Sequence, residues 1–122
     1  MFTLDTNVII YYLAGDVEVV TWLDKEAAHA AVYVPTVVRA ELLSKPGLTK
    51  KQYVDVITFP SQTQQVPLDT HIADLVGDIR RLTKLRTPDA IVAATALSAG
   101  TTLLTRNTKD FTKVPSLNVM KV

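Results

Sequence analysis

The chain has 122 residues, which suits one domain and is too short for two, and 48% of them are hydrophobic, enough for a packed core. It has no cysteine, which excludes a disulfide framework, a thiolate metal site and thiol catalysis and fits a reducing cytoplasm. Its formal net charge is only +1, so affinity for an anionic partner has to come from where the charges lie.

Neither a membrane span nor a secretory leader is expected. The longest apolar run, residues 8–14, has seven residues against the roughly 20 that cross a bilayer. Asp5 falls where a leader needs a basic start and then an apolar stretch. We therefore expect a cytoplasmic protein with a single domain over residues 1–122.

Short β-like runs alternate with helical periodicity along the chain. In chain order, the pattern predicts a strand at residues 2–4, helices at 7–14 and 17–30, a strand at 31–34, helices at 36–44 and 48–58, a strand at 64–68, helices at about 70–85 and 88–99, and strands at 102–105 and 117–122. Asp16 and Asp69 are expected N-caps, Pro88 opens a helix, and Gly15 and Gly100 close two others. Nearly apolar strands separated by helices predict an α/β fold with a parallel sheet covered on both faces.

Four acidic residues follow a strand or lie in a crossover in otherwise apolar surroundings: Asp5, Glu41, Asp89 and Asp110. Active groups in open parallel sheets gather beyond the carboxyl ends of the strands. Four carboxylates there would repel one another unless protons or a cation compensated, and oxygen ligands favour Mg²⁺ or Mn²⁺. Zinc is disfavoured because His29 and His71 fall away from this edge.

Each acid also has an ordinary structural explanation when taken alone. Asp89 is placed to bind backbone amides at the start of a helix. Glu41 is placed to pair with Arg39, and Asp110 to serve as a turn residue before Phe111. The hypothesis of a metal site rests on the set rather than on any single member.

The stretches "LDTNVII", "VVRAELL", "PDAIVAATAL" and "LLTRNTKDF" together resemble the four motifs of PIN-domain ribonucleases, specifically the VapC-type toxins of toxin–antitoxin pairs. The resemblance implies a three-layer α/β/α fold with a five-stranded parallel sheet in the order 3-2-1-4-5. It also implies a metal-dependent endoribonuclease whose catalytic acids, which hold Mg²⁺ or Mn²⁺, are Asp5, Glu41, Asp89 and Asp110.

The resemblance further assigns roles around these acids. Asn107 stands where the family often has another acid, so it is expected to coordinate the metal or position a water, with one or two metal ions as alternatives. Thr6 and Thr105 match hydroxyls that orient the acids or the metal-bound water. A cognate antitoxin is expected to pack near Tyr11, Tyr12 and Trp22, and a homodimer to form through residues 49–85.

Charge placement supports an anionic substrate. Twelve acidic residues less the four proposed ligands leave eight, against 13 basic residues. Basic residues cluster beside three of the four acids, which favours phosphate contacts over a merely solvated surface. The residues expected to bind substrate are Arg80, Arg86, Arg106 and Lys109.

Two other classes of protein remain as alternatives. A phosphoacceptor receiver domain has a similar architecture, with Asp55 as its candidate acceptor, but Thr6 and Asn7 follow Asp5 where a receiver needs paired acids. A non-catalytic PIN-like module that binds RNA or protein is favoured by Asn107 alone.

Overall fold

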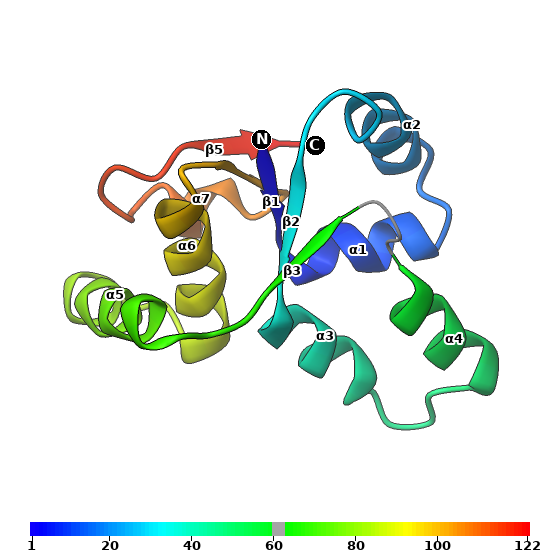
Figure 1. Ribbon diagram of the computed structural model, residues 1–122, viewed down its shortest axis with the longest axis horizontal. Helices are drawn as coiled ribbons and strands as arrows, with labels where there is room; N and C mark the ends of the chain where they lie inside the picture. The colour runs from blue at the N-terminus through cyan, green and yellow to red at the C-terminus, as the bar shows by residue number, and fades with distance from the viewer. Residues whose placement is uncertain (60–62) are drawn as a thin grey trace.

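The computed structural model of the chain describes residues 1–59 and 63–122. Its sheet has five parallel strands in the order β3-β2-β1-β4-β5 (Figure 1). The strands are β1 (Phe2–Leu4), β2 (Val32–Pro35), β3 (Gln64–Val66), β4 (Thr102–Thr105) and β5 (Val119–Lys121). The predicted sheet and its strand order are confirmed.

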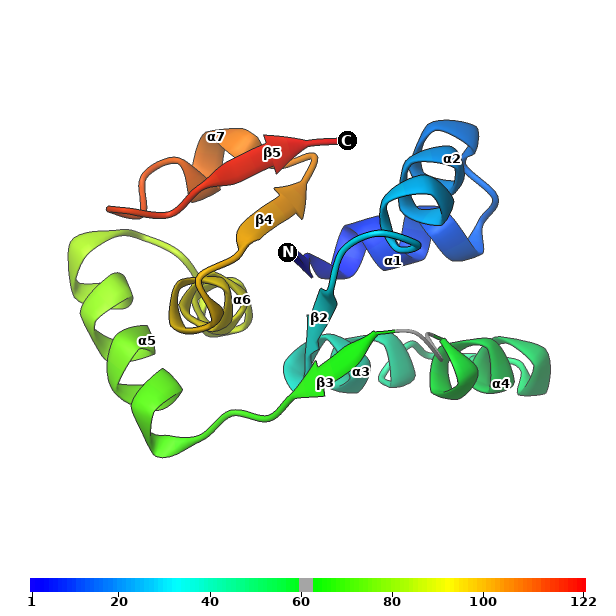
Figure 2. The same cartoon turned by 45° about the horizontal axis from the view of Figure 1, so that its top comes forward.

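The helices lie on both sides of this sheet. In chain order they are α1 (Thr6–Leu13), α2 (Val17–Glu26), α3 (Thr36–Leu43), α4 (Lys50–Thr58), α5 (Thr70–Leu82), α6 (Thr87–Ala99) and α7 (Thr108–Phe111). In two views, α5 and α6 lie on one side of the strands and α1, α2 and α4 on the other (Figures 1 and 2). The three-layer α/β/α architecture is therefore confirmed.

Local sequence explains how the main helices form and pack. Helix α6 buries every residue from Ala90 to Ala96, as expected of a helix that is apolar all round and lies in the core. Helix α5 instead buries Ile72, Val76 and Ile79, which recur at steps of three and four residues. Gly100 ends α6 with a φ of 66°, a left-handed conformation that glycine adopts without steric cost.

The sheet register decides where the functional residues lie. Leu4 of β1 is opposite Leu104 of β4, so the chain leaves both strands at the same edge. Asp5 follows β1, and its backbone N–H donates to the Leu104 carbonyl at 3.2 Å. The residues that follow Leu4 and Leu104 therefore meet across the end of the sheet.

Two predicted helices end three or four residues earlier in the structure, and one short helix was not predicted. Helix α2 ends at Glu26 and not at residue 30, because the chain has to turn before Ala31, whose carbonyl accepts from Phe2 N at 3.0 Å. His29 therefore lies beyond α2. Helix α5 ends at Leu82, and α7 was not predicted because four residues carry no readable periodicity. None of the helices in residues 1–59 and 63–122 has the length and apolar character needed to cross a membrane.

Candidate active site

A cavity of about 530 Å³ lies beyond the ends of β1 and β4, and all four predicted acids line it. Asp5 follows β1, Glu41 lies on α3, Asp89 in the first turn of α6, and Asp110 on α7. The fold therefore brings together carboxylates from four separate segments of the chain.

Asp5 is the most enclosed of these acids, with 4% of its surface exposed. Its Oδ1 accepts from the Thr6 backbone N–H at 2.8 Å, and its Oδ2 accepts from the Thr105 hydroxyl at 2.9 Å. Burial raises the pKa of the Asp5 carboxyl, the bond from Thr105 lowers it, and the nearby charge of Asp89 raises it. Asp5 is thus held in place by two hydrogen bonds, although burial disfavours its ionised form.

Asp89 is subject to the same conflict between burial and charge. Its pKa is raised first by burial and next by the charge of Glu41, while Arg86 lowers it and Asp110 raises it. Each of the four acids therefore acts electrostatically on at least one other. A cation in this cavity would relieve that repulsion.

Three neutral residues orient the acids. The Thr6 hydroxyl donates to Glu41 Oε1 at 2.8 Å. The Asn107 amide donates from Nδ2 to Asp110 Oδ2 at 3.0 Å. The Thr105 hydroxyl, besides donating to Asp5, accepts from Asn107 N at 2.9 Å. These bonds connect Asp5 to Asp110 through Thr105 and Asn107.

The chemistry of the cavity fits a hard divalent cation. Its lining offers carboxylate, hydroxyl and amide oxygens and contains no histidine. In residues 1–59 and 63–122, however, no three acidic or histidine side chains lie close enough together to form a ready-made ligand cluster. The four acids thus share a cavity but would have to draw closer to hold one ion.

The predicted substrate-binding residues are placed differently from one another. Arg86 lines the cavity, whereas Arg80 and Lys109 do not. Arg80 donates to the carbonyl of Leu85 at 3.4 Å, and Arg106 forms an ion pair with Asp16. Two lysines that do line the cavity, Lys84 and Lys113, were seen in the sequence only as members of the basic clusters.

Four further residues of the cavity had not been singled out as functional: Asn7, Ile10, Thr83 and Leu85. Asn7 directly follows "LDT" in the first motif, which was the available signal. Ile10 is one helical turn further along α1 and had no signal beyond that periodicity.

Several solved structures match this chain over nearly its whole length. A chain of VapBC2 from Rickettsia felis, solved with a promoter DNA fragment, is 21% identical, with a TM-score of 0.87 over 98% of this chain and 97% of that one. A toxin–antitoxin complex from Klebsiella pneumoniae is 29% identical, with a TM-score of 0.81 over 98% and 96%. VapBC from Salmonella typhimurium, also bound to DNA, is 21% identical, with a TM-score of 0.86 over 98% and 96%.

No curated protein sequence matches the chain significantly. The structural matches agree with the likeness to VapC-type proteins that the four motifs indicated. The PIN domain family matches residues 2–117, and the chain therefore belongs to the PIN domain family.

Proposed function

We propose that the chain is a Mg²⁺- or Mn²⁺-dependent endoribonuclease and the toxin of a toxin–antitoxin pair. One observation carries the catalytic part of the proposal: Asp5, Glu41, Asp89 and Asp110, from four separate segments, line one cavity in a PIN-family fold. Four acids in one cavity repel one another, which lowers the stability of the metal-free protein. Such an arrangement is expected of a cation site.

These four acids would hold the metal, with Asn107 beside them. A divalent ion bound there would acidify a bound water and stabilise charge on a phosphodiester oxygen. The chain's own contribution is orientation: Thr105 and Thr6 direct hydroxyls at Asp5 and Glu41, and the Asn107 amide fixes Asp110. Precisely oriented ligands matter because supporting hydrogen bonds are typically worth 10- to 100-fold in metal affinity.

Phosphate recognition is proposed for the basic residues at the cavity. Arg86 and Lys84 lie in the loop between α5 and α6, and Lys113 follows α7. All three are exposed, so they are accessible to an RNA backbone, although Lys113 also lies 3.9 Å from Asp110 in an ion pair. They would place a phosphodiester next to the acids and offset the charge that those acids carry.

The nuclease proposal is tested by incubating the purified chain with RNA in Mn²⁺ or in EDTA. We expect cleavage in Mn²⁺ and none in EDTA. The second candidate, a PIN-like module that binds RNA or protein without cutting, is favoured by Asn107, whose amide replaces a charge in the cavity. RNA binding without cleavage in Mn²⁺ would favour that module.

The proposed partner is an antitoxin that packs along α1 and α2. The solved complex from Klebsiella pneumoniae is a toxin–antitoxin complex, and we propose the same pairing here. A second cavity, of about 610 Å³, lies beside these helices; Tyr12, Leu13, Leu23 and Phe59 are among its lining residues, and so is Asp24. An apolar segment that carries a basic residue would match this lining.

Of the three aromatic residues expected at that interface, only Tyr12 lines the cavity. Its ring packs edge to face on Phe59, with centroids 5.2 Å apart. Trp22 packs in the same manner on Phe2, at 4.8 Å, and the Tyr11 ring lies under Arg106. We therefore propose an antitoxin interface at Tyr12 and the apolar residues around it.

Expression of the chain alone is expected to slow bacterial growth, because a free endoribonuclease depletes RNA. Co-expression with the adjacent small reading frame should restore growth. The measurement is a growth curve with each gene induced separately and together, and Asp5→Asn serves as the inactive control. If the chain is harmless while it cuts RNA in vitro, the assignment as a toxin is wrong.

A homodimer is proposed through residues 49–85. Tyr53, Val54 and Ile57 of α4 are exposed to 36–48%, and an apolar surface of this kind favours association. Light scattering at micromolar concentration should give about twice the 13.4 kDa of one chain. Ile57→Asp should shift the mass toward that of the monomer, whereas Val17→Asp, on α2, should not; a monomeric wild type contradicts the proposal.

A further inference from the structure

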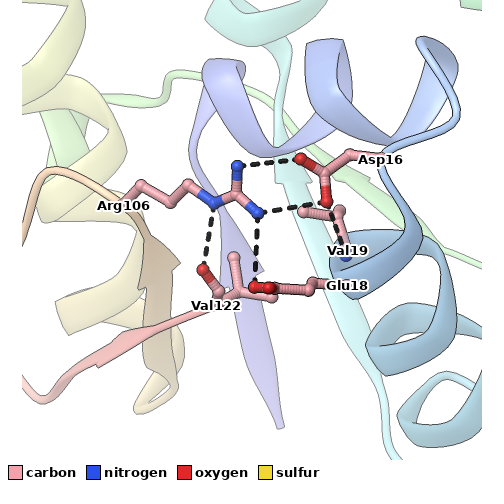
Figure 3. A network of polar contacts seen from close by, with 5 residues as sticks. All are labelled: Asp16, Glu18, Val19, Arg106 and Val122. Carbon is pink, nitrogen blue, oxygen red and sulfur yellow. Dashed lines mark hydrogen bonds and ion pairs between the residues drawn. The ribbon is translucent and has the colours of Figure 1, made fainter.

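Arg106 directly follows β4 and does not line the acidic cavity. Its side chain contacts Asp16 and Val122 instead (Figure 3). Its two terminal nitrogens donate to the two carboxylate oxygens of Asp16, at 2.9 and 3.1 Å. Its Nε donates to the carbonyl of Val122 at 3.0 Å, just beyond β5. The polar atoms of the guanidinium are therefore used on Asp16 and Val122.

Further contacts hold the Arg106 side chain in this position. Its guanidinium carbon lies 4.5 Å from the centroid of the Tyr11 ring of α1, a cation–π distance. Asp16 is the N-cap of α2 and also accepts from Val19 N at 3.3 Å. The pKa of Asp16 is lowered first by the Arg106 bonds and then by that cap, so the pair stays ionised at neutral pH.

The residues on either side of Arg106 contact two of the candidate metal ligands. Thr105 donates to Asp5, and Asn107 donates to Asp110. Asn107 is the N-cap of α7, but its side chain makes no capping bond and is used on Asp110 instead. Three consecutive residues therefore send one side chain outward to α2 and two side chains inward to the acids.

We infer that Arg106 is a positioning residue for the candidate active site: by fastening the turn between β4 and α7 to α1 and α2, it holds Thr105 on Asp5 and Asn107 on Asp110. The inference rests on the proposed function, because the acids matter only if they bind a metal. It replaces a role for Arg106 in binding substrate.

The test is a calorimetric titration of Mn²⁺ into the purified chain and its variants. Arg106→Ala should weaken Mn²⁺ binding about 10-fold, the lower end of what supporting residues contribute to metal affinity. The Mn²⁺ affinity of Arg106→Lys should lie between those of wild type and Arg106→Ala, since an ammonium cannot form the paired bonds to Asp16. Glu18→Gln is the matched control, because Glu18 is 83% exposed and 3.8 Å from the guanidinium.

Asp16→Asn keeps the inference testable if Arg106→Ala does not fold. Asparagine remains a good N-cap, so α2 should persist while the ion pair is lost. Mn²⁺ binding should weaken in the same direction as in Arg106→Ala, though by less. Hydrogen exchange in EDTA gives a readout without metal. The backbone N–H of Asn107, which donates to Thr105 Oγ1, should exchange faster in Arg106→Ala and Asp16→Asn than in Glu18→Gln.

Cleavage kinetics separate positioning from substrate contact. A positioning role lowers kcat and leaves KM for RNA nearly unchanged, whereas a phosphate contact raises KM. Variants that melt earlier but bind Mn²⁺ as tightly as wild type, or that change only KM, would overturn the inference alone. Wild type that binds no Mn²⁺ would overturn the proposed function and the inference with it.

Discussion

Replacing Asp5 by asparagine should reduce RNA cleavage by more than about 100-fold, because residues that merely support metal ligands are already worth 10- to 100-fold. Asp5 is buried, and both of its oxygens accept hydrogen bonds that aim the carboxylate. An amide has a single acceptor oxygen and no charge, so it loses the attraction for the cation and one of the two bonds. The measurements are the cleavage rate in Mn²⁺ and the shift in melting temperature that Mn²⁺ produces.

Asp74→Asn is the matched control for this change. Asp74 lies on α5, is exposed and does not line the cavity, so the same chemical substitution should leave cleavage within about twofold of wild type. An Asp5→Asn protein that is folded and cuts RNA at nearly the wild-type rate would remove Asp5 from the site and with it most of the proposed chemistry.

Asp89→Asn should also abolish cleavage, yet leave the metal-free protein at least as stable as wild type at neutral pH. Burial and the charge of Glu41 disfavour the ionised Asp89 carboxylate in the folded state. An amide at this position removes that repulsion and is compatible with the first turn of α6, where the Asp89 side chain makes no hydrogen bond within residues 1–59 and 63–122 that would be lost. Mn²⁺ should stabilise wild type by binding only the folded state, and the mutant much less.

The pH dependence of stability follows from the same shift. Because the folded-state pKa of Asp89 is raised above its ordinary value of 3.8, the folded state holds the proton more tightly than the unfolded state. That contribution to stability is fully present below pH 3.8 and is lost as the pH rises through the raised pKa. Without metal, the stability of wild type should therefore fall over this window more than that of Asp89→Asn.

Thermal melts in EDTA and in Mn²⁺, at several pH values, test this prediction. If Asp89 acts chiefly as a charge at the helix N-terminus, the mutant should instead lose about 0.3 to 1 kcal/mol and keep its response to Mn²⁺. A less stable Asp89→Asn protein that still gains full stability from Mn²⁺ and still cuts RNA contradicts the assignment of Asp89 as a ligand.

Most of the fold could be predicted because its signals are local. The N-caps Asp16 and Asp69 accept from Val19 N and Ile72 N, as their place before apolar-periodic stretches indicated. The apolar stretch from Ala90 to Ala94 in α6 indicated a buried helix, and all of these residues are buried. Parallel topology then followed from the alternation of strands and helices.

Contacts of single side chains were less accessible. Arg106 was predicted to bind substrate because it belongs to the basic cluster around Asp110. Nothing in the sequence indicated that its side chain pairs with Asp16, 90 residues earlier in the chain. Lys84 and Lys113, which do line the cavity, looked like any other lysine in a basic cluster. A charge pattern shows that cations are present but not the direction in which each one extends.

The α/β class, the strand order implied by the family resemblance, and the four candidate acids could be read from the sequence, because caps, apolar periodicity and motif spacing are properties of short segments. The packed structure adds that those acids share one cavity, that Thr105 and Asn107 connect Asp5 to Asp110, and that Arg106 pairs with Asp16. Burial, charge coupling and hydrogen bonds depend on the distance between segments that are far apart in the chain. That distance is set only when β1 pairs with β4 and when α1, α3 and α6 pack around the ends of these strands.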